Sequence, residues 1–187
     1  INLVIPSQRA IPATLMDPKI KNRSRMWYQM ANLEVSKVEG DNNWALLIDP
    51  DGYIAEGTGD NFFMIKDGVI ITPESRNILR GVSREYIFEL AKELNIPCIE
   101  KNIEPYDVYD ADEAFVCATP FCMLPVASLN SYKINNKNQI NITKKLIDQW
   151  SDNVGVDIVG QIKNYHIELG GLKTSAPTPY QFKNKLD

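Results

Sequence analysis

The pattern of hydrophobic and polar positions predicts several short strands separated by turns. Apolar residues gather in short runs bounded by turn residues, at positions 2–5, 44–49, 53–55, 62–66, 69–72, 98–101 and 113–118. Runs of this kind are typical of β-strands. Lys66-Asp67-Gly68-Val69 lies between two of them and is a strong hairpin signal, because Asp-Gly favours the tight turns that join antiparallel strands.

The clearest helical pattern runs from Ser83 to Leu94. Apolar residues recur there at the spacing of one helical face, and Ser83 is placed to cap the first turn. Asn95-Ile96-Pro97 then ends the pattern. We expect further helices over 23–38 (with Met26, Met30 and Leu33 on one face), over 105–110, and from 144 towards 154.

Strands and helices mix without a regular strand–helix–strand rhythm. This favours a mixed α+β domain over a doubly wound parallel sheet. We expect one domain over residues 1–155. A tail over 156–187, polar and then proline-rich, is expected to wrap the surface or to be partly disordered, and His166 within it is expected to be an ordinary surface residue.

Composition narrows the function classes. The chain has 187 residues and a net charge of −4, which argues against a general nucleic-acid-binding protein. No apolar run is long enough to span a bilayer. Three scattered cysteines fit a reducing, cytoplasmic setting, and Cys117 and Cys122 are poorly spaced for zinc, so no metal site is expected. The strand-like start at Ile1 suggests that the sequence begins mid-protein.

Two sequence features could hold opposite ends of one ligand. Gly81-Val82-Ser83 opens the predicted helix, and the free N–H groups of a helix start form an anion site. Glu56 ends a predicted strand before a glycine-rich turn, where a carboxylate could bind a protonated ring nitrogen. Taken singly, each has an ordinary structural explanation: a capped helix and a surface acid.

Two further features could complete such a site. Lys21 lies 35 positions before Glu56, and a lysine that loses its proton can attack a carbonyl to form a Schiff base. Ala118-Thr119 follows the strand over 113–118, where the threonine could donate to a phosphate. Taken singly, these are a surface lysine and a turn threonine.

The four features, in this order, resemble the signature of class IV (fold type IV) pyridoxal-phosphate aminotransferases. The family includes branched-chain amino acid aminotransferases, D-amino acid aminotransferases and 4-amino-4-deoxychorismate lyases. The resemblance rests mainly on residues 56–63, 70–72 and 79–84, with Pro18-Lys19-Ile20-Lys21 before them and 111–115 with Ala118-Thr119 after them. It implies a mixed sheet or pseudo-barrel with flanking helices, as in the large C-terminal domain of these enzymes, with the family's small N-terminal domain absent.

The resemblance also implies roles for particular residues. Lys21 would form the Schiff base with pyridoxal 5'-phosphate (PLP) and move the substrate α-proton. Glu56 would pair with the pyridine nitrogen, and Leu79 would pack on the ring. Val82 and Ser83 would bind the phosphate, with a second contact from Ala118 and Thr119.

The implied reaction is transamination between an amino acid, branched-chain in the leading hypothesis, and a 2-oxo acid, in a homodimer or higher assembly. Departures from the family pattern leave the substrate open: Arg80 stands where many members have proline, Ala118 where many have glycine, and Arg25-Met26 where branched-chain enzymes often have Asn-Tyr. The alternatives are a lyase acting on aminodeoxychorismate, a D-amino acid aminotransferase, and a truncated, catalytically silent cofactor domain.

Overall fold

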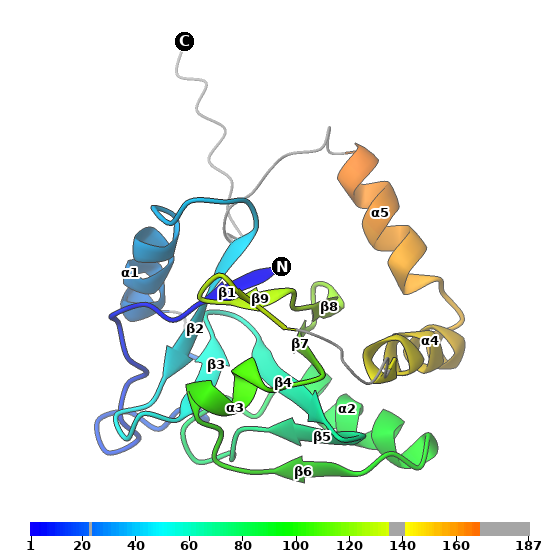
Figure 1. The fold of residues 1–187 in the computed structure, drawn as a ribbon, viewed down its shortest axis with the longest axis horizontal. Coiled ribbons are helices and arrows are strands. Elements are labelled where there is room, and N and C mark those ends of the chain that lie inside the picture. Colours follow the sequence, from blue (N-terminus) through cyan, green and yellow to red (C-terminus); the bar gives the residue numbers. More distant parts are fainter. Residues whose placement is uncertain (23, 135–140, 169–187) are drawn as a thin grey trace.

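The computed structural model describes residues 1–22, 24–134 and 141–168 of the chain (Figure 1). Its strands are β1 (Asn2–Val4), β2 (Asn43–Ile48), β3 (Ile54–Gly57), β4 (Asn61–Lys66), β5 (Val69–Thr72), β6 (Cys98–Glu100), β7 (Glu113–Ala118), β8 (Cys122–Pro125), β9 (Ser128–Leu129) and β10 (Tyr132–Lys133). Its helices are α1 (Met26–Val35), α2 (Val82–Glu93), α3 (Pro105–Tyr109), α4 (Ile142–Val154) and α5 (Ile158–Glu168).

The strands form one mixed sheet. Its order is β10-β9-β1-β2-β3-β4-β5-β6, and β7 branches from β4 to pair with β8. β1 runs parallel to β2 and β9, and β5 runs parallel to β6, while the other pairs are antiparallel. The mixed α+β class is therefore confirmed. Within the described residues the strand order has free ends, so the sheet does not close into a barrel.

The central pair β4–β7 separates two hydrophobic layers, because successive side chains of a strand point to opposite faces. Phe63 and Phe115 stack with ring centroids 4.8 Å apart, in the layer covered by α2 and α4. Phe62 and Met64 face the other layer, together with Val108 of α3. Figure 1 shows α1 on one side of the molecule and α4 with α5 on the other.

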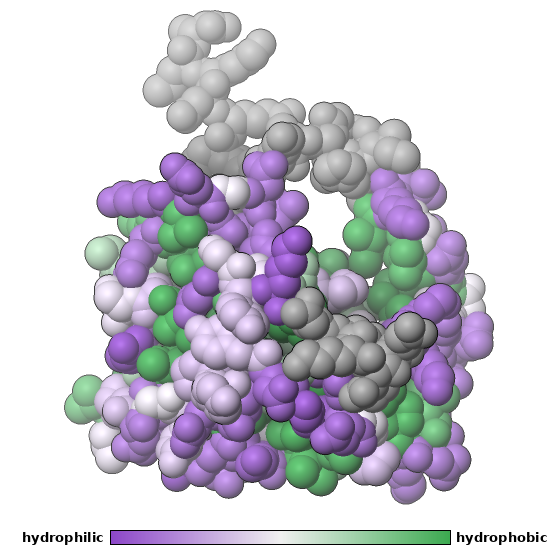
Figure 2. All heavy atoms as spheres, in the orientation of Figure 1, coloured by the Kyte–Doolittle hydropathy of each residue, from purple (hydrophilic) through white to green (hydrophobic). Residues whose placement is uncertain are grey.

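A third cluster packs α1 against β2 and β3. Its helical members, Ala31 and Val35, are almost fully buried. The face with Met26, Met30 and Leu33 points outward, and these side chains are 70%, 52% and 57% exposed. The sequence pattern therefore groups the three residues correctly on one face, but that face is not the buried one. Hydrophobic atoms also reach the surface on the α1 side in Figure 2.

Several element predictions are confirmed and some need correction. The β4–β5 hairpin forms at the predicted turn, with Asp67 and Gly68 at φ 50° and 79°. Helix α2 begins at Val82 after Gly81, so Ser83 lies inside the helix and does not cap it. Strands β8, β9 and β10 and helix α5 are additions that the sequence pattern does not predict.

The predicted tail over 156–187 is described only in part. Helix α5 occupies its beginning, and Ile158 packs into the core beside α4. The side chain of His166 lies outside what the structure describes. None of the described helices is long and apolar enough to cross a membrane.

Candidate active site

Glu56 is a buried carboxylate near the end of β3. Its side chain is only 6% exposed. Its Oε1 accepts a hydrogen bond from the Tyr28 hydroxyl at 2.6 Å, and its Oε2 accepts one from the Leu79 backbone N–H at 2.9 Å. Burial raises the pKa of Glu56 to about 7, and the two donors oppose that rise because they favour the ionised form. Glu56 is thus a buried acid whose position and pKa are set by its hydrogen bonds, and not a solvated surface group.

Asn61 connects Glu56 to the start of α2. It pairs directly with Glu56 across the β3–β4 ladder. Its Nδ2 donates to the Leu79 carbonyl at 2.9 Å and lies 3.5 Å from Glu56 Oε2. Its Oδ1 lies close to Gly81: a Cβ atom added to Gly81 would be only 2.2 Å from this oxygen. One buried side chain therefore fixes the spacing between the carboxylate and the helix start.

The start of α2 offers backbone donors. The first N–H groups of any helix have no partner within the helix, and among the described residues no side chain caps them at Gly81. Val82 is 83% exposed, whereas Ser83 is buried. Uncapped N–H groups and the helix dipole favour an anion at this position.

Arg84 holds this helix start against the sheet. Its guanidinium donates to the Pro73 carbonyl at 3.0 Å and pairs with Glu100 of β6. The side chain is almost fully buried and lies over the Phe88 ring. Arg84 therefore acts as a structural anchor for the helix start and is not a solvated surface residue.

The segment with Lys21 folds as turns beside Glu56. Pro18, Ile20 and Asn22 line a cavity of about 30 Å³ that also contacts Glu56 and Leu79. Lys21 itself is exposed and is not part of the lining. The structure thus brings the Lys21 segment, Glu56 and Leu79 together, while Lys21 itself does not line their cavity.

The charges of Lys19 and Arg80 both act on Asp17, in the segment that precedes Lys21. The pKa of Asp17 is lowered, first by the Lys19 backbone N–H and side chain, and also by the charge of Arg80. Asp17 and Lys19 form an ion pair at 3.1 Å. The segment that precedes Lys21 therefore lies within electrostatic reach of the residue before Gly81.

Ala118 and Thr119 lie at the end of β7. Ala118 is buried and pairs with Cys122 of β8, and Thr119 is exposed in the turn that follows. The neighbouring register pairs Cys117 with Asn61. Because β4 and β7 are adjacent at this point, the end of β7 and the residues that hold the α2 start lie at the same end of the strand pair.

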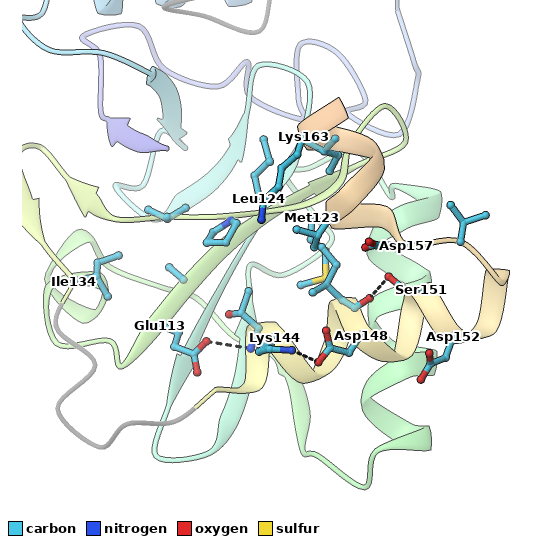
Figure 3. A pocket seen from close by; sticks show the side chains of 18 of the residues that line it. Glu113, Met123, Leu124, Ile134, Lys144, Asp148, Ser151, Asp152, Asp157 and Lys163 are labelled. Atoms are coloured by element: carbon cyan, nitrogen blue, oxygen red, sulfur yellow. Dashed lines mark hydrogen bonds and ion pairs between the residues drawn. The ribbon is translucent and has the colours of Figure 1, made fainter. Parts of the chain in front are cut away.

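A larger cavity of about 1080 Å³ opens elsewhere, between α4, α5 and β8 (Figure 3). Met123 and Leu124 line it together with helix residues such as Asp148, which pairs with Lys144. None of the predicted site residues belongs to it. Size alone therefore does not identify the functional site.

Sequence reasoning missed three residues of the Glu56 site: Tyr28, Asn61 as a connector, and Asp60. Asp60 is buried, and its Oδ1 has no hydrogen-bond partner in the described part of the chain. Burial and the charge of Glu56 raise its pKa to about 7. The signal for Tyr28 was available, since Tyr28, Ala31, Asn32 and Val35 follow helical spacing on the side of α1 that packs inward.

Comparison with known proteins decides the family. The family model described as Amino-transferase class IV matches residues 1–129. The chain belongs to this family. A Pseudomonas aeruginosa branched-chain-amino-acid aminotransferase is 40% identical to the class IV chain over 115 residues, which are 62% of the chain and 38% of the relative.

Two further comparisons agree. A relative from Methanocaldococcus jannaschii, provisionally named for the same activity, is 35% identical over 153 residues, or 81% of the chain and 52% of the relative. The crystal structure of a branched-chain amino acid aminotransferase from Thermobaculum terrenum in its PLP form superposes with a TM-score of 0.76 at 30% identity, covering 82% of the class IV chain and 50% of that protein. The matched part of the chain spans between 38% and 52% of the length of these relatives.

Proposed function

We propose that the protein catalyses PLP-dependent transamination between a branched-chain amino acid and a 2-oxo acid, and that this chain is the part that holds the cofactor. The observation that carries the proposal is the connection made by Asn61. It ties a buried carboxylate, Glu56, to an uncapped helix start at Gly81. A ring nitrogen and a phosphate on one rigid ligand need such a pair of groups at a fixed spacing.

The residues present fit PLP in their chemistry. Glu56 supplies a carboxylate for the ring nitrogen, and the α2 start supplies unpaired N–H donors for the phosphate. The space beside Glu56 is about 30 Å³, roughly the volume of one water molecule. A pyridine ring is larger than this space, so we propose that the Pro18–Asn22 segment, which lines it, moves when PLP binds.

Each residue then has a defined task. Glu56 holds a proton at the ring nitrogen, and the backbone N–H groups of Val82 and Ser83 bind phosphate oxygens. Leu79 packs on the ring. When bound, PLP supplies an electron sink for the charge left by loss of the substrate α-proton.

Like Val82 and Ser83, the residues proposed for two further roles lie outside the small cavity. Lys21 is proposed to bind the cofactor covalently and to move the α-proton, and its segment already borders Glu56. Ala118 and Thr119 are proposed to give the second phosphate contact. The role of Ala118 and Thr119 is supported by their position at the end of β7, beside the residue Asn61 of β4.

Substrate assays test the reaction directly. The 187-residue chain with PLP should transfer the amino group of leucine to 2-oxoglutarate in a coupled assay. Release of pyruvate from aminodeoxychorismate would instead favour the lyase, and use of D-alanine would favour the D-amino acid branch. PLP binding without turnover of any of these substrates would contradict catalysis by this chain and favour a silent cofactor domain.

We also propose that the protein assembles as a homodimer or larger homo-oligomer in the cytoplasm. The support for association is the exposed apolar face of α1, formed by Met26, Met30 and Leu33. Burial of such side chains against a second copy would remove apolar surface from water.

A further inference from the structure

The hydrogen bonds to Glu56 divide unequally between its two oxygens. Oε1 has one partner in the described part of the chain, the Tyr28 hydroxyl at 2.6 Å. Oε2 receives the Leu79 N–H at 2.9 Å, with Asn61 Nδ2 at 3.5 Å. The Tyr28 distance is in the range of a charge-assisted O–H···O⁻ bond, which is among the stronger hydrogen bonds in proteins.

Tyr28 is held beside Glu56 by its place in α1 and by its neighbours on that helix. It is the third residue of α1, half-buried on the inward side of the helix, and it lines the small cavity with Glu56. The Arg25 guanidinium lies 5.3 Å from the Tyr28 ring centroid. Arg25 also donates to the carbonyls of Asn22 and Thr58, which fixes it between the Lys21 segment and the β3–β4 turn.

We propose that Tyr28 is a positioning residue for Glu56: its hydroxyl lowers the basicity of the carboxylate and so keeps the shared proton on the ring nitrogen of the cofactor. The inference rests on the proposed function, because it concerns how Glu56 meets PLP. Tyr28 acts through Glu56 and does not itself need to touch the ring.

The physical reason is competition for one proton. A carboxylate without donors in a buried site is a strong base and would draw the proton away from a pyridine nitrogen. A short hydrogen bond from Tyr28 stabilises the ionised carboxylate, and so does the nearby positive charge of Arg25. Asp60 acts in the opposite direction when it is ionised, because it and Glu56 repel each other. Of these groups, Tyr28 is the one in direct contact with Oε1.

The same contact also orients the carboxylate. With Tyr28 on Oε1 and Leu79 on Oε2, Glu56 is bound from α1 and from the segment before α2. Rotation of the carboxylate would break both bonds. The carboxylate is thus held in one orientation beside the cavity that Glu56, Tyr28 and Leu79 line.

The experiment compares Tyr28→Phe with the parent chain, first without cofactor. Carboxyl-¹³C-labelled glutamate, with Glu56→Gln to assign the signal, gives the titration midpoint of Glu56 by NMR. Loss of the hydroxyl should move that midpoint upward by about one pH unit, the scale of a charge-assisted hydrogen bond. Tyr106→Phe is the matched control, because Tyr106 is 77% exposed on α3 and should leave the midpoint unchanged.

A second arm uses PLP labelled with ¹⁵N in the ring. The ring-nitrogen shift should report a protonated ring in the parent and in Tyr106→Phe, and a less protonated ring in Tyr28→Phe at the same pH. An unchanged Glu56 midpoint, or an unchanged ring-nitrogen shift, would overturn the inference. If the parent binds no PLP, the proposed function fails and the inference fails with it. If the parent binds PLP but Tyr28→Phe has no effect, only the inference about Tyr28 fails.

Discussion

At the scale of single residues, two buried carboxyl groups interact where β3 leads into β4: Glu56 near the end of β3, and Asp60 in the turn that follows. Glu56 has three donors near its oxygens, whereas Asp60 has an oxygen without a partner among the described residues. Burial is the largest cause of the raised pKa of both, to about 7 in each case. Such paired, perturbed acids are typical of functional sites.

Asp60 should make the fold more stable at low pH. Its pKa rises from 3.8 to about 7 on folding, so the folded state binds more protons than the unfolded state between these values. The free energy of unfolding therefore falls as pH rises from about 4 to 7, by on the order of 3 kcal/mol from this group. Asp60→Asn should reduce that fall, measured by urea unfolding at pH 4 and pH 7.

The control for this prediction is Asp152→Asn, which changes an exposed carboxyl on α4. It should keep the pH dependence of the parent. If Asp60→Asn loses as much unfolding free energy between pH 4 and pH 7 as the parent, then Asp60 is not a buried acid with a raised pKa.

At the scale of elements, the position of α2 depends on a close approach between a strand and a helix start. Gly81 has φ −75°, which any residue can adopt, so its backbone conformation does not require glycine. The requirement comes from Asn61, whose Oδ1 would lie 2.2 Å from an added Cβ. Gly81→Ala should therefore displace α2 from Asn61.

The expected cost is about 1–3 kcal/mol of unfolding free energy, as for other overpacked sites, together with weaker PLP binding. The matched control is Gly59→Ala, where no atom lies within 4 Å of the added Cβ. Urea unfolding and titration with PLP, followed by absorbance, measure both effects. Equal stability and equal PLP affinity in the two variants would show that the Asn61–Gly81 contact does not set the site.

Elements with strong local signals could be predicted from the sequence. The Asp67-Gly68 hairpin and strand β7 follow from turn chemistry and apolar runs, and both form as expected. The short strands β9 and β10 could not be predicted, because two-residue strands exist only through their sheet partners. The face of α1 was ambiguous because small and polar residues, Ala31 and Asn32, form its buried side.

The same distinction applies to the site. Glu56, Val82 and Ser83 could be singled out as candidates because they lie in one continuous motif, and their roles stay a prediction. The contact between Tyr28 and Glu56 joins residues 28 positions apart, and only the docking of α1 on β2 and β3 creates it. The exposed position of Lys21 could not be predicted either, since it depends on how the turns at 13–20 pack.

At the scale of the whole molecule, the outward face of α1 is the feature that most concerns assembly. Met26, Met30 and Leu33 are exposed side chains one helical turn apart. If a second copy covers this face, Leu33→Lys should place a charge in the interface and shift the chain towards monomer. Glu89→Lys is the control, because it makes an even larger charge change, of two units against one, at an exposed position on α2.

Light scattering over a range of protein concentrations measures this shift. The parent and Glu89→Lys should associate alike, and Leu33→Lys should dissociate at higher concentrations than either. A parent that stays monomeric throughout, or equal association of all three, would contradict a dimer built on α1.

The central claim is that the molecule holds PLP with Lys21 as the covalent attachment point, and reduction with borohydride tests it most directly. The 187-residue chain is mixed with PLP, reduced, digested and mapped by mass spectrometry. We predict one modified peptide, with the phosphopyridoxyl group on Lys21, and Lys19, which is ion-paired to Asp17, provides the internal comparison. A chain left unmodified, or one labelled on Lys19 or other lysines and not on Lys21, would contradict the account.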